Sequence, residues 1–321
     1  MPYSVILGNL GNTCDRFLSS GYKKNLSTEE MFKKAASIKE VEGIELVGTW
    51  DITTKNVKEI GKLLQDYNIK LVSIIPDHFS QPCWGKGAFT SRDPKIRRSA
   101  IEHTKEMIDI LVELKGGLIN LWPGQDGYDY LFQGNYDEAY AQLVEGIREC
   151  AQYNCNIKIS LEYKPKEPRN FSYLARSADT LLLALETGAE NVGITVDVGH
   201  SIMAGENVSE TVFRLMKANK LFHMHFNDNY QSWDDDMIVG SVHTILYIEL
   251  LFWLKKMNYQ GWYSMDQYPY REDGKEALNQ SIQWLIALNE KISEYGMEKI
   301  EAIIRRGEAT EISEEVRKLL F

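Results

Sequence analysis

Short apolar segments alternate along the chain with longer amphipathic ones. Eight of the apolar segments stand out, and several are β-branched and apolar at nearly every position, which is typical of strands covered on both faces. They lie at 3–8, 43–48, 69–75, 116–122, 157–163, 192–198, 221–226 and 261–266. Their recurrence at intervals of several tens of residues leaves room for a helix after each strand and predicts a parallel sheet.

Eight segments with helical periodicity fill those intervals. The first opens with a capping box, in which Glu30 follows Ser27 by three residues. They lie at 27–38, 54–67, 93–114, 137–153, 177–188, 208–219, 243–257 and 275–292. Eight alternating strands and helices predict an α/β fold, the (β/α)8 TIM barrel, as one catalytic domain over 1–290. The charged segment 291–321 has no place in the barrel, so we expect a C-terminal helical extension that serves oligomerisation.

Composition and charge narrow the functional classes. The chain has 321 residues, of which 44% are hydrophobic and 26% charged, as in ordinary globular proteins. The net charge of −10 and the lack of a basic run argue against nucleic acid as a partner. No apolar run approaches the ~18 residues of a membrane span, and the first residues lack a signal-peptide pattern. Cys14, Cys83, Cys150 and Cys155 are scattered, so we expect a reduced, cytoplasmic protein.

Charged and imidazole side chains gather at the ends of the last four predicted strands. Barrel enzymes place their chemistry at the C-terminal ends of the strands. The residues at these ends are Glu162, Lys164, Asp197, His200, His223, His225, Asn227, the three aspartates at 234–236 and Asp266. The first four predicted strands end in Asn9, Trp50–Asp51, Asp77–His78 and Trp122. One side of the barrel mouth is therefore rich in groups of the metal-binding type.

Each of these residues has a simpler explanation when it is taken alone. Glu162 could form a salt bridge in the barrel, His200 could cap the following helix, and the aspartates could lie in a solvated loop. Together they favour a cation, because clustered carboxylates without one cost several kcal/mol. Oxygen ligands with imidazole suit Mn²⁺, Mg²⁺ or Co²⁺ better than a structural zinc ion.

Five segments carry a resemblance to a known family. The segments at 86–101, 121–130, 162–168, 225–241 and 265–267 resemble the metal-dependent sugar isomerases of the xylose isomerase-like barrel superfamily. The L-rhamnose isomerase branch is the most similar. The resemblance runs from about residue 40 to residue 290, and the first strand shows none.

The resemblance implies two metal sites. Glu162, Asp197, His225 and Asp266 match the four ligands found throughout the superfamily. The second, catalytic site of the two-metal isomerases is matched by His200, Asp234 and Asp236, with Asp197 between the sites, although the loop length leaves Asp235 as an alternative. We therefore expect one or two divalent ions per subunit, Mn²⁺ first and Mg²⁺ or Co²⁺ as alternatives.

The resemblance also implies catalytic and substrate-binding roles. Lys164 matches a lysine that holds the carbonyl oxygen of the sugar, and Glu162, Asp266 and Asp234 join it as the expected catalytic groups. Trp122 and Phe89 match aromatic walls that exclude water from the sugar. A histidine used elsewhere in the family for ring opening has no counterpart, and His78, with Asp77 beside it, is the candidate substitute. His223 is expected to be a core or supporting residue.

The spacing of Lys164 from Glu162 gives an independent expectation. The two residues are two positions apart on a strand, so both side chains point toward the barrel interior and its mouth. Two cations nearby would lower the pKa of Lys164. The alternative is a lysine that forms ion pairs with the surplus carboxylates.

The function implied is a metal-dependent sugar isomerase that interconverts an aldose and a ketose, assembled as a homodimer or homotetramer. Asp266 stands where the epimerases of the superfamily have a glutamate, which modestly favours an isomerase over a ketose 3-epimerase. Two enzyme alternatives stay open: a ketose 3-epimerase, and the large subunit of a C-glycoside deglycosidase with a small β-sandwich partner. A sugar-binding barrel without turnover is the third alternative. The charge argues against the DNA-repair endonucleases of the same fold.

Overall fold

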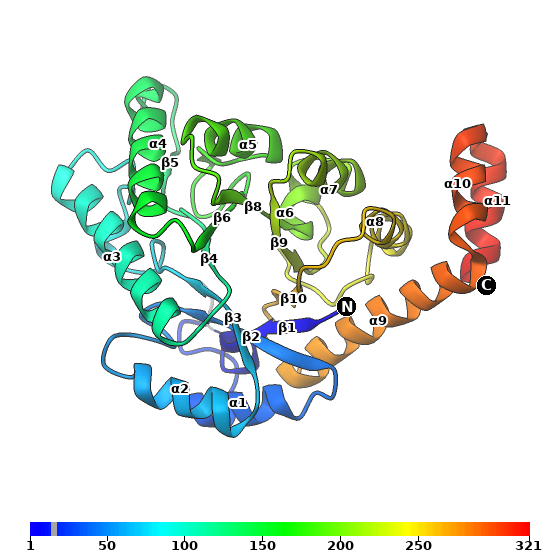
Figure 1. Ribbon diagram of the computed structural model, residues 1–321, viewed down its shortest axis with the longest axis horizontal. Coiled ribbons are helices and arrows are strands. Elements are labelled where there is room, and N and C mark those ends of the chain that lie inside the picture. The colour runs from blue at the N-terminus through cyan, green and yellow to red at the C-terminus, as the bar shows by residue number, and fades with distance from the viewer. Residues whose placement is uncertain (14–17) are drawn as a thin grey trace.

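Eight parallel strands form a closed barrel in the computed structural model, which describes residues 1–13 and 18–321 and leaves Cys14 outside (Figure 1). They are β1 (Tyr3–Ile6), β2 (Val41–Val47), β3 (Lys70–Ile75), β4 (Leu118–Leu121), β6 (Lys158–Glu162), β8 (Val192–Asp197), β9 (Leu221–Phe226) and β10 (Tyr263–Met265). Strands that follow one another in the barrel pair side by side, and β1 closes the ring on β10. The predicted (β/α)8 fold is confirmed.

Helices surround the barrel at the positions that the periodicity predicts. They are α1 (Thr28–Ala36), α2 (Val57–Asp66), α3 (Pro94–Glu113), α4 (Tyr136–Tyr153), α5 (Ser177–Glu186), α7 (Val208–Lys217), α8 (Thr244–Lys256) and α9 (Gly274–Tyr295). The capping box at the start of α1 is present, with Ser27 and Glu30 bonding each other's backbone. The helices bury apolar faces against the outer side of the strands, which explains why the strands read as almost continuously apolar.

Short elements in the βα loops were not predicted. They are η1 (Leu7–Leu10), η2 (Pro82–Trp84), α6 (Val198–Met203) and the two-stranded sheet of β5 (Gly127–Tyr128) with β7 (Phe171–Ser172). The helix α6 begins directly after β8 because the Asp197 side chain caps it, accepting a hydrogen bond of 2.8 Å from the His200 backbone N–H. This turn brings His200 back over the end of β8.

The interior of the barrel is unexpectedly polar. Seven fully buried polar residues lie on its strands, in addition to the residues predicted for the site: Ser4, Glu45, Ser73, Asn120, Ser160, Thr195 and Ser264. Six of them, all except Ser4, bond one another in the barrel interior, as in the 2.6 Å contact from the Thr195 hydroxyl to Asn120 Oδ1. Buried polar groups of this kind are stable only when their hydrogen bonds are made.

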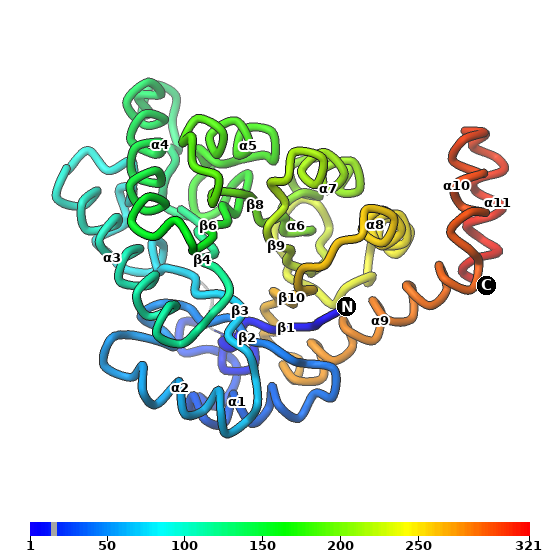
Figure 2. Tube along the Cα trace, in the orientation of Figure 1, coloured from blue at the N-terminus to red at the C-terminus, as the bar shows by residue number. Residues whose placement is uncertain are grey.

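The last two helices, α10 (Met297–Arg306) and α11 (Ala309–Leu320), lie side by side at the far end of α9, away from the strands (Figure 2). The helix α9 runs through residue 290, so the predicted boundary between barrel and extension falls inside one helix. The extension is helical, as expected, and its role in oligomerisation stays a prediction. Among the described helices, none combines the length and the apolar character that a membrane crossing requires.

Candidate metal centre

Four predicted ligands converge at the C-terminal end of the barrel. Glu162, Asp197, His225 and Asp266 each offer one ligand atom, and these atoms all lie within 4.8 Å of one another. Three of them stand at the ends of β6, β8 and β9, and Asp266 follows β10 directly. Asp197 pairs with His225 in the register of β8 and β9, so their side chains lie at the same level. The structure therefore brings the whole first predicted ligand set together.

The electrostatics of this group fit a divalent cation. The Nδ1 atom of His225 is buried and makes no hydrogen bond, and it lies 3.4 Å from Glu162 Oε1 and 3.4 Å from Asp266 Oδ2. Burial raises the pKa of Asp197 to about 7. The charge of His200 acts against this rise, and neighbouring carboxylates, including Asp234, add to it. A cation at this position would relieve that repulsion, and three carboxylates with one imidazole are ligands that Mn²⁺ and related ions accept.

Amide side chains orient two of the carboxylates. Asn120 Nδ2 donates to Glu162 Oε2 at 2.7 Å, and Asn227 Nδ2 donates to Asp197 Oδ2 at 2.7 Å. Gly199 permits the second contact, because a Cβ at that position would lie 2.1 Å from Asn227 Oδ1. The sequence offered only a weak signal for these residues, since a buried asparagine in a strand shows its partner only in three dimensions.

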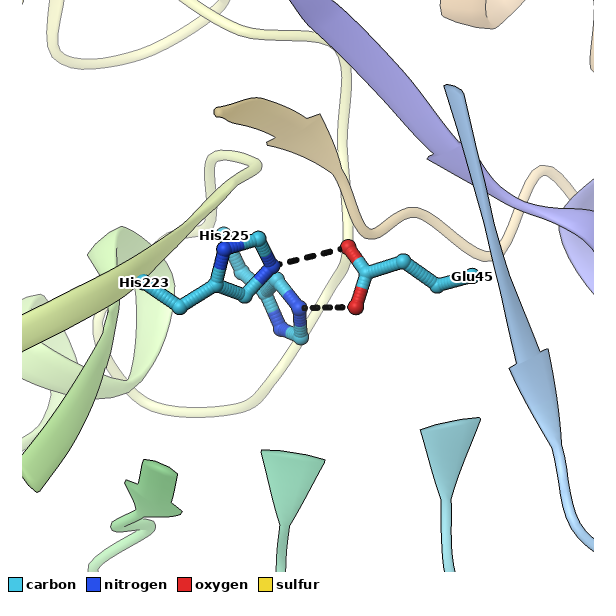
Figure 3. A group of neighbouring side chains, drawn as sticks. All are labelled: Glu45, His223 and His225. Carbon is cyan, nitrogen blue, oxygen red and sulfur yellow. Dashed lines mark hydrogen bonds and ion pairs between the residues drawn. The ribbon is translucent and has the colours of Figure 1, made fainter. Parts of the chain in front are cut away.

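A second cluster lies deeper in the barrel. Figure 3 shows Glu45 reaching from β2 toward the two imidazoles of β9, with hydrogen bonds of 2.9 Å to His223 Nε2 and 3.3 Å to His225 Nε2. Burial would raise the pKa of Glu45, but the two imidazoles hold it well below its usual range. Glu45 was missed, although a lone carboxylate in the apolar segment 43–48 is a signal that a buried partner exists. His223 is fully buried and bonds Glu45, and its expected role as a core or supporting residue stays a prediction.

The residues predicted for a second metal are near one another but are bonded differently. His200 Nε2 lies 3.1 Å from Asp234 Oδ2, and the Lys164 ammonium lies 2.7 Å from the same oxygen. Lys164 also forms an ion pair of 3.0 Å with Glu167. Asp236 lines the same cavity, whereas Asp235 accepts a hydrogen bond from the Tyr230 backbone. A lysine cation thus already neutralises Asp234.

The charges of the chain itself act on Lys164 in the direction opposite to that expected beside two metals. Burial opposes its charge, but Asp234 and Glu167 outweigh burial and raise its pKa. Burial also opposes the charge of His200. The carboxylates of Asp197 and Asp234 outweigh this effect of burial and raise the pKa of His200 to about 9. In the structure Lys164 is therefore an ion-paired cation, which is the alternative considered for it.

A cavity of about 320 Å³ opens onto the metal ligands and has two unlike sides. The charged side carries Glu162, Lys164, Glu167, His200, Asp234, Asp236 and Asp266. The other side carries Ile6, Val47, Trp50, Ile75, Phe79 and Trp122. The Phe79 ring lies 4.8 Å from that of Trp122 and 5.5 Å from that of Trp50, and Lys164 Nζ lies 5.2 Å from the Trp122 ring. The predicted aromatic wall at Trp122 is present in the lining of this cavity.

The structure does not bring Phe89 and His78 to this cavity. His78 Nε2 lies 3.2 Å from the Ala100 carbonyl oxygen on α3, and its ring packs 5.1 Å from Phe89. Burial, together with the neighbouring His103, lowers the pKa of His78 to about 3. Both residues are in the packing between a loop and α3, and their roles as substrate contacts stay untested predictions.

Comparisons with known proteins agree with this architecture. A family model described as the xylose isomerase-like TIM barrel matches residues 32–288. Xylose isomerase from Thermus thermophilus is 29% identical over 229 residues, and that from Thermus caldophilus is 28% identical over 229 residues. Each alignment covers 69% of this chain and 59% of the relative, so the chain spans less than two thirds of these proteins.

Solved structures with the same fold include sugar epimerases. A D-tagatose 3-epimerase-like protein superimposes with a TM-score of 0.66 at 22% identity, covering 91% of this chain and 99% of that chain. An L-ribulose 3-epimerase superimposes with a TM-score of 0.69 at 12% identity, covering 94% and 97%. The narrower resemblance to L-rhamnose isomerases gains no support from these relatives. With a family model that matches most of its length and a closed eight-stranded barrel, the chain belongs to the xylose isomerase-like TIM barrel family.

Proposed function

We propose that the protein is a divalent-metal-dependent sugar epimerase that removes and returns a proton at a carbon next to the carbonyl of a keto-sugar. The observation that carries this proposal is the pair of carboxylates, Glu162 and Asp266, within one candidate metal centre. Both also line the cavity, and they come from strands separated by β8 and β9. The 3-epimerase names of several structural relatives support the same class of reaction.

The two carboxylates suit a two-base mechanism. Inverting a carbon requires that a proton leave one face and that another arrive on the opposite face. Glu162, ionised at the start, would take the proton from one face, and Asp266, protonated at the start, would supply a proton to the other. Proton exchange with solvent would then return both carboxyl groups to their starting forms, and the roles exchange in the reverse direction. A divalent ion held by Glu162, Asp197, His225 and Asp266 would supply polarisation of the sugar carbonyl.

Neighbouring residues would hold the sugar and exclude water. Lys164 lies at the boundary between the charged and aromatic sides of the cavity, so its ammonium could donate a hydrogen bond to a sugar oxygen. Trp122 and Phe79 would cover the apolar C–H face of the ring or chain. His200 and Asp234 would keep Lys164 in place, because all three are linked by contacts of 3.1 Å or less.

Binding of one divalent ion per chain is a simpler arrangement than binding of two. His200 adjoins the four-ligand centre, with its Nδ1 atom 3.3 Å from Glu162 Oε1, but Lys164 already supplies positive charge to Asp234 in the neighbouring group. We propose one Mn²⁺, with Mg²⁺ or Co²⁺ as substitutes, and expect that a second ion would have to displace the lysine.

Aldose–ketose isomerisation is the second candidate. Asp266 is one methylene shorter than the glutamate that the sequence resemblance leads us to expect in an epimerase, and the sequence relatives are xylose isomerases. The two reactions can share a proton abstraction beside a carbonyl, but a two-metal isomerase moves the hydrogen as hydride, which solvent does not exchange.

Turnover in heavy water tests the proposal and separates the candidates. Metal-stripped and Mn²⁺-restored protein would be given a panel of ketoses, aldoses and keto-glycosides in D₂O. We expect Mn²⁺-dependent conversion of a ketose into its epimer with deuterium at the inverted carbon. Aldose–ketose conversion without deuterium would favour the second candidate, cleavage of a keto-glycoside would favour a deglycosidase, and no conversion of any sugar would contradict the proposal.

A further inference from the structure

We propose that Glu45 is a positioning residue that selects which nitrogen of His225 faces the metal, so that Nδ1 presents its lone pair to the candidate centre. The inference deepens the proposed function, because it rests on a metal being held by Glu162, Asp197, His225 and Asp266. It assigns a role to a carboxylate that the reaction itself does not use. Glu45 lies three strands away from β9 around the barrel and meets it only across the interior.

The hydrogen bond between Glu45 and His225 sets the tautomer. An ionised carboxylate only accepts, so His225 Nε2, 3.3 Å from Glu45 Oε2, must carry the proton in that contact. The neutral imidazole then has its lone pair on Nδ1, which is buried and faces the Glu162 and Asp266 oxygens at 3.4 Å. When a divalent ion binds between them, the Nδ1 lone pair and the two carboxylates can therefore face it together.

The hydrogen bonds around Glu45 also show why it is not an ion ligand. Oε1 accepts from His223 Nε2 and from the Ser264 hydroxyl, while Oε2 accepts from His225 Nε2 and from the Ser73 hydroxyl. Each oxygen thus has two donors, which fills the usual acceptor positions of a carboxylate. The group of Glu45, His223 and His225 is a hydrogen-bonded clamp, although its atoms are close enough to hold a metal.

His223 supplies a matched control inside this clamp. It bonds Glu45 Oε1 at 2.9 Å, on the carboxylate oxygen that does not contact His225, and it is absent from the four-ligand group. Its ring is buried as completely as that of His225. Replacing His223 therefore disturbs the same buried region without removing the bond that sets the His225 tautomer.

Calorimetric titration of the full-length, metal-stripped chain with Mn²⁺ tests the inference. In Glu45→Gln we expect the Kd to rise about 10- to 100-fold, the usual effect of losing a carboxylate behind a ligating histidine. In His223→Gln we expect the Kd to stay within about threefold of wild type, since the ligand and its partner are intact. Equal losses in the two variants, or an unchanged Kd in Glu45→Gln, would overturn the inference. So would a second Mn²⁺ per chain that His223→Gln abolishes, because the clamp would then be an ion site.

A measurement on the wild-type protein tests the inference even if the variants do not fold. In the Mg²⁺-loaded protein, the imidazole ¹⁵N resonances should report a protonated Nε2 and an unprotonated Nδ1 for His225. A protonated Nδ1 would overturn the inference. These readouts are independent of turnover. A protein whose Mn²⁺ affinity depends on Glu45 as expected but that converts no sugar would contradict the proposed function alone. A protein that turns over with an unchanged Kd in Glu45→Gln would contradict the inference alone.

Discussion

The two sides of the barrel mouth differ in the charge of the side chains that they present. The side built by β6, β8, β9 and β10 presents buried carboxylates beside imidazoles, and burial, with a smaller effect of the neighbouring carboxylates, raises the pKa of Asp197. The side built by β1 to β4 presents aliphatic and aromatic groups, including Phe79 between Trp50 and Trp122, that pack without any ligand. A divalent cation would stabilise the first side, whereas the second side packs without one.

This difference suggests a division of roles between chemistry and binding. Charges that are costly in the free protein are the ones available to polarise a substrate, and they work best where water is excluded. Apolar side chains provide that exclusion and hold the C–H face of a sugar, but they cannot move a proton. Variants on the charged side should therefore change the rate or the metal affinity, and variants on the apolar side should change substrate affinity.

The largest effect is expected for Glu162→Gln, which removes both a ligand and the proposed base. We expect kcat to fall on the order of a thousandfold or more, with weaker Mn²⁺ binding, because an amide neither bridges a cation strongly nor accepts a carbon-bound proton. Steady-state kinetics with saturating Mn²⁺ measure this loss. Glu145→Gln, at a carboxylate on α4 away from the cavity, is the control and should match wild type. Turnover within a few-fold of wild type in Glu162→Gln would contradict the catalytic role given to the charged side of the cavity.

The next largest effect is expected for Lys164→Met. Removing the ammonium takes away one of the two charged partners of the buried Asp234 and leaves His200, so both the melting temperature and kcat should fall, the latter by about a hundredfold or more. The double variant Lys164→Met/Asp234→Asn separates the two roles, since it removes the ion pair as a unit. We expect it to regain most of the lost melting temperature but not the lost turnover. Turnover that returns together with stability would mean that Lys164 is only structural.

On the apolar side, Phe79→Ala should act on substrate affinity. The ring packs between Trp50 and Trp122, and its loss should raise KM about tenfold while kcat stays within a few-fold of wild type. Phe79→Leu, which keeps most of the apolar volume, should recover part of the affinity. A fall in kcat without a change in KM would contradict this prediction, because Phe79 would then affect the chemical step and not substrate affinity.

The smallest effect on turnover is expected for Asp51→Asn, at a buried carboxylate beside the apolar side. Burial, only partly offset by a hydrogen bond from the Val47 backbone, raises the pKa of Asp51 to about 6. A carboxyl with a raised folded-state pKa favours the folded state at low pH, and this stability is lost as the pH rises through about 6. Asp51→Asn should therefore be more stable than wild type at pH 7.5 by about 1–3 kcal/mol, and similar to it at pH 4.

Urea unfolding of both proteins at the two pH values checks this prediction. The difference between them isolates Asp51 from the other carboxylates that titrate in the same range. A difference in unfolding free energy that does not depend on pH would show that Asp51 is not the titrating group.

The sequence predicted the barrel because its strongest signals are local. Strand segments such as 69–75 and helices such as 93–114 carry their own periodicity, and the ends of successive strands must meet at one face of a barrel. That rule predicts that Glu162, Asp197, His225 and Asp266 lie at one end of the barrel among other polar residues, and the family resemblance predicts that these four form one ligand set. The structure brings their ligand atoms within 4.8 Å of one another.

What the sequence could not supply are contacts across the barrel and the directions of loop side chains. Glu45 and His223 are 178 residues apart, and nothing in either segment identifies the other. His78 follows a strand as expected, yet its side chain turns toward α3 because the Ala100 carbonyl and Phe89 receive it there. Position at a strand end predicts proximity to a site, but not orientation toward it.

The most direct test of the account is the location of the metal. Anomalous diffraction from crystals soaked in Mn²⁺ should show one strong site, with ligand atoms of Glu162, Asp197, His225 and Asp266 within about 2.5 Å and His225 bound through Nδ1. No anomalous peak at this position, or a peak bound instead by Glu45 and His223, would contradict it.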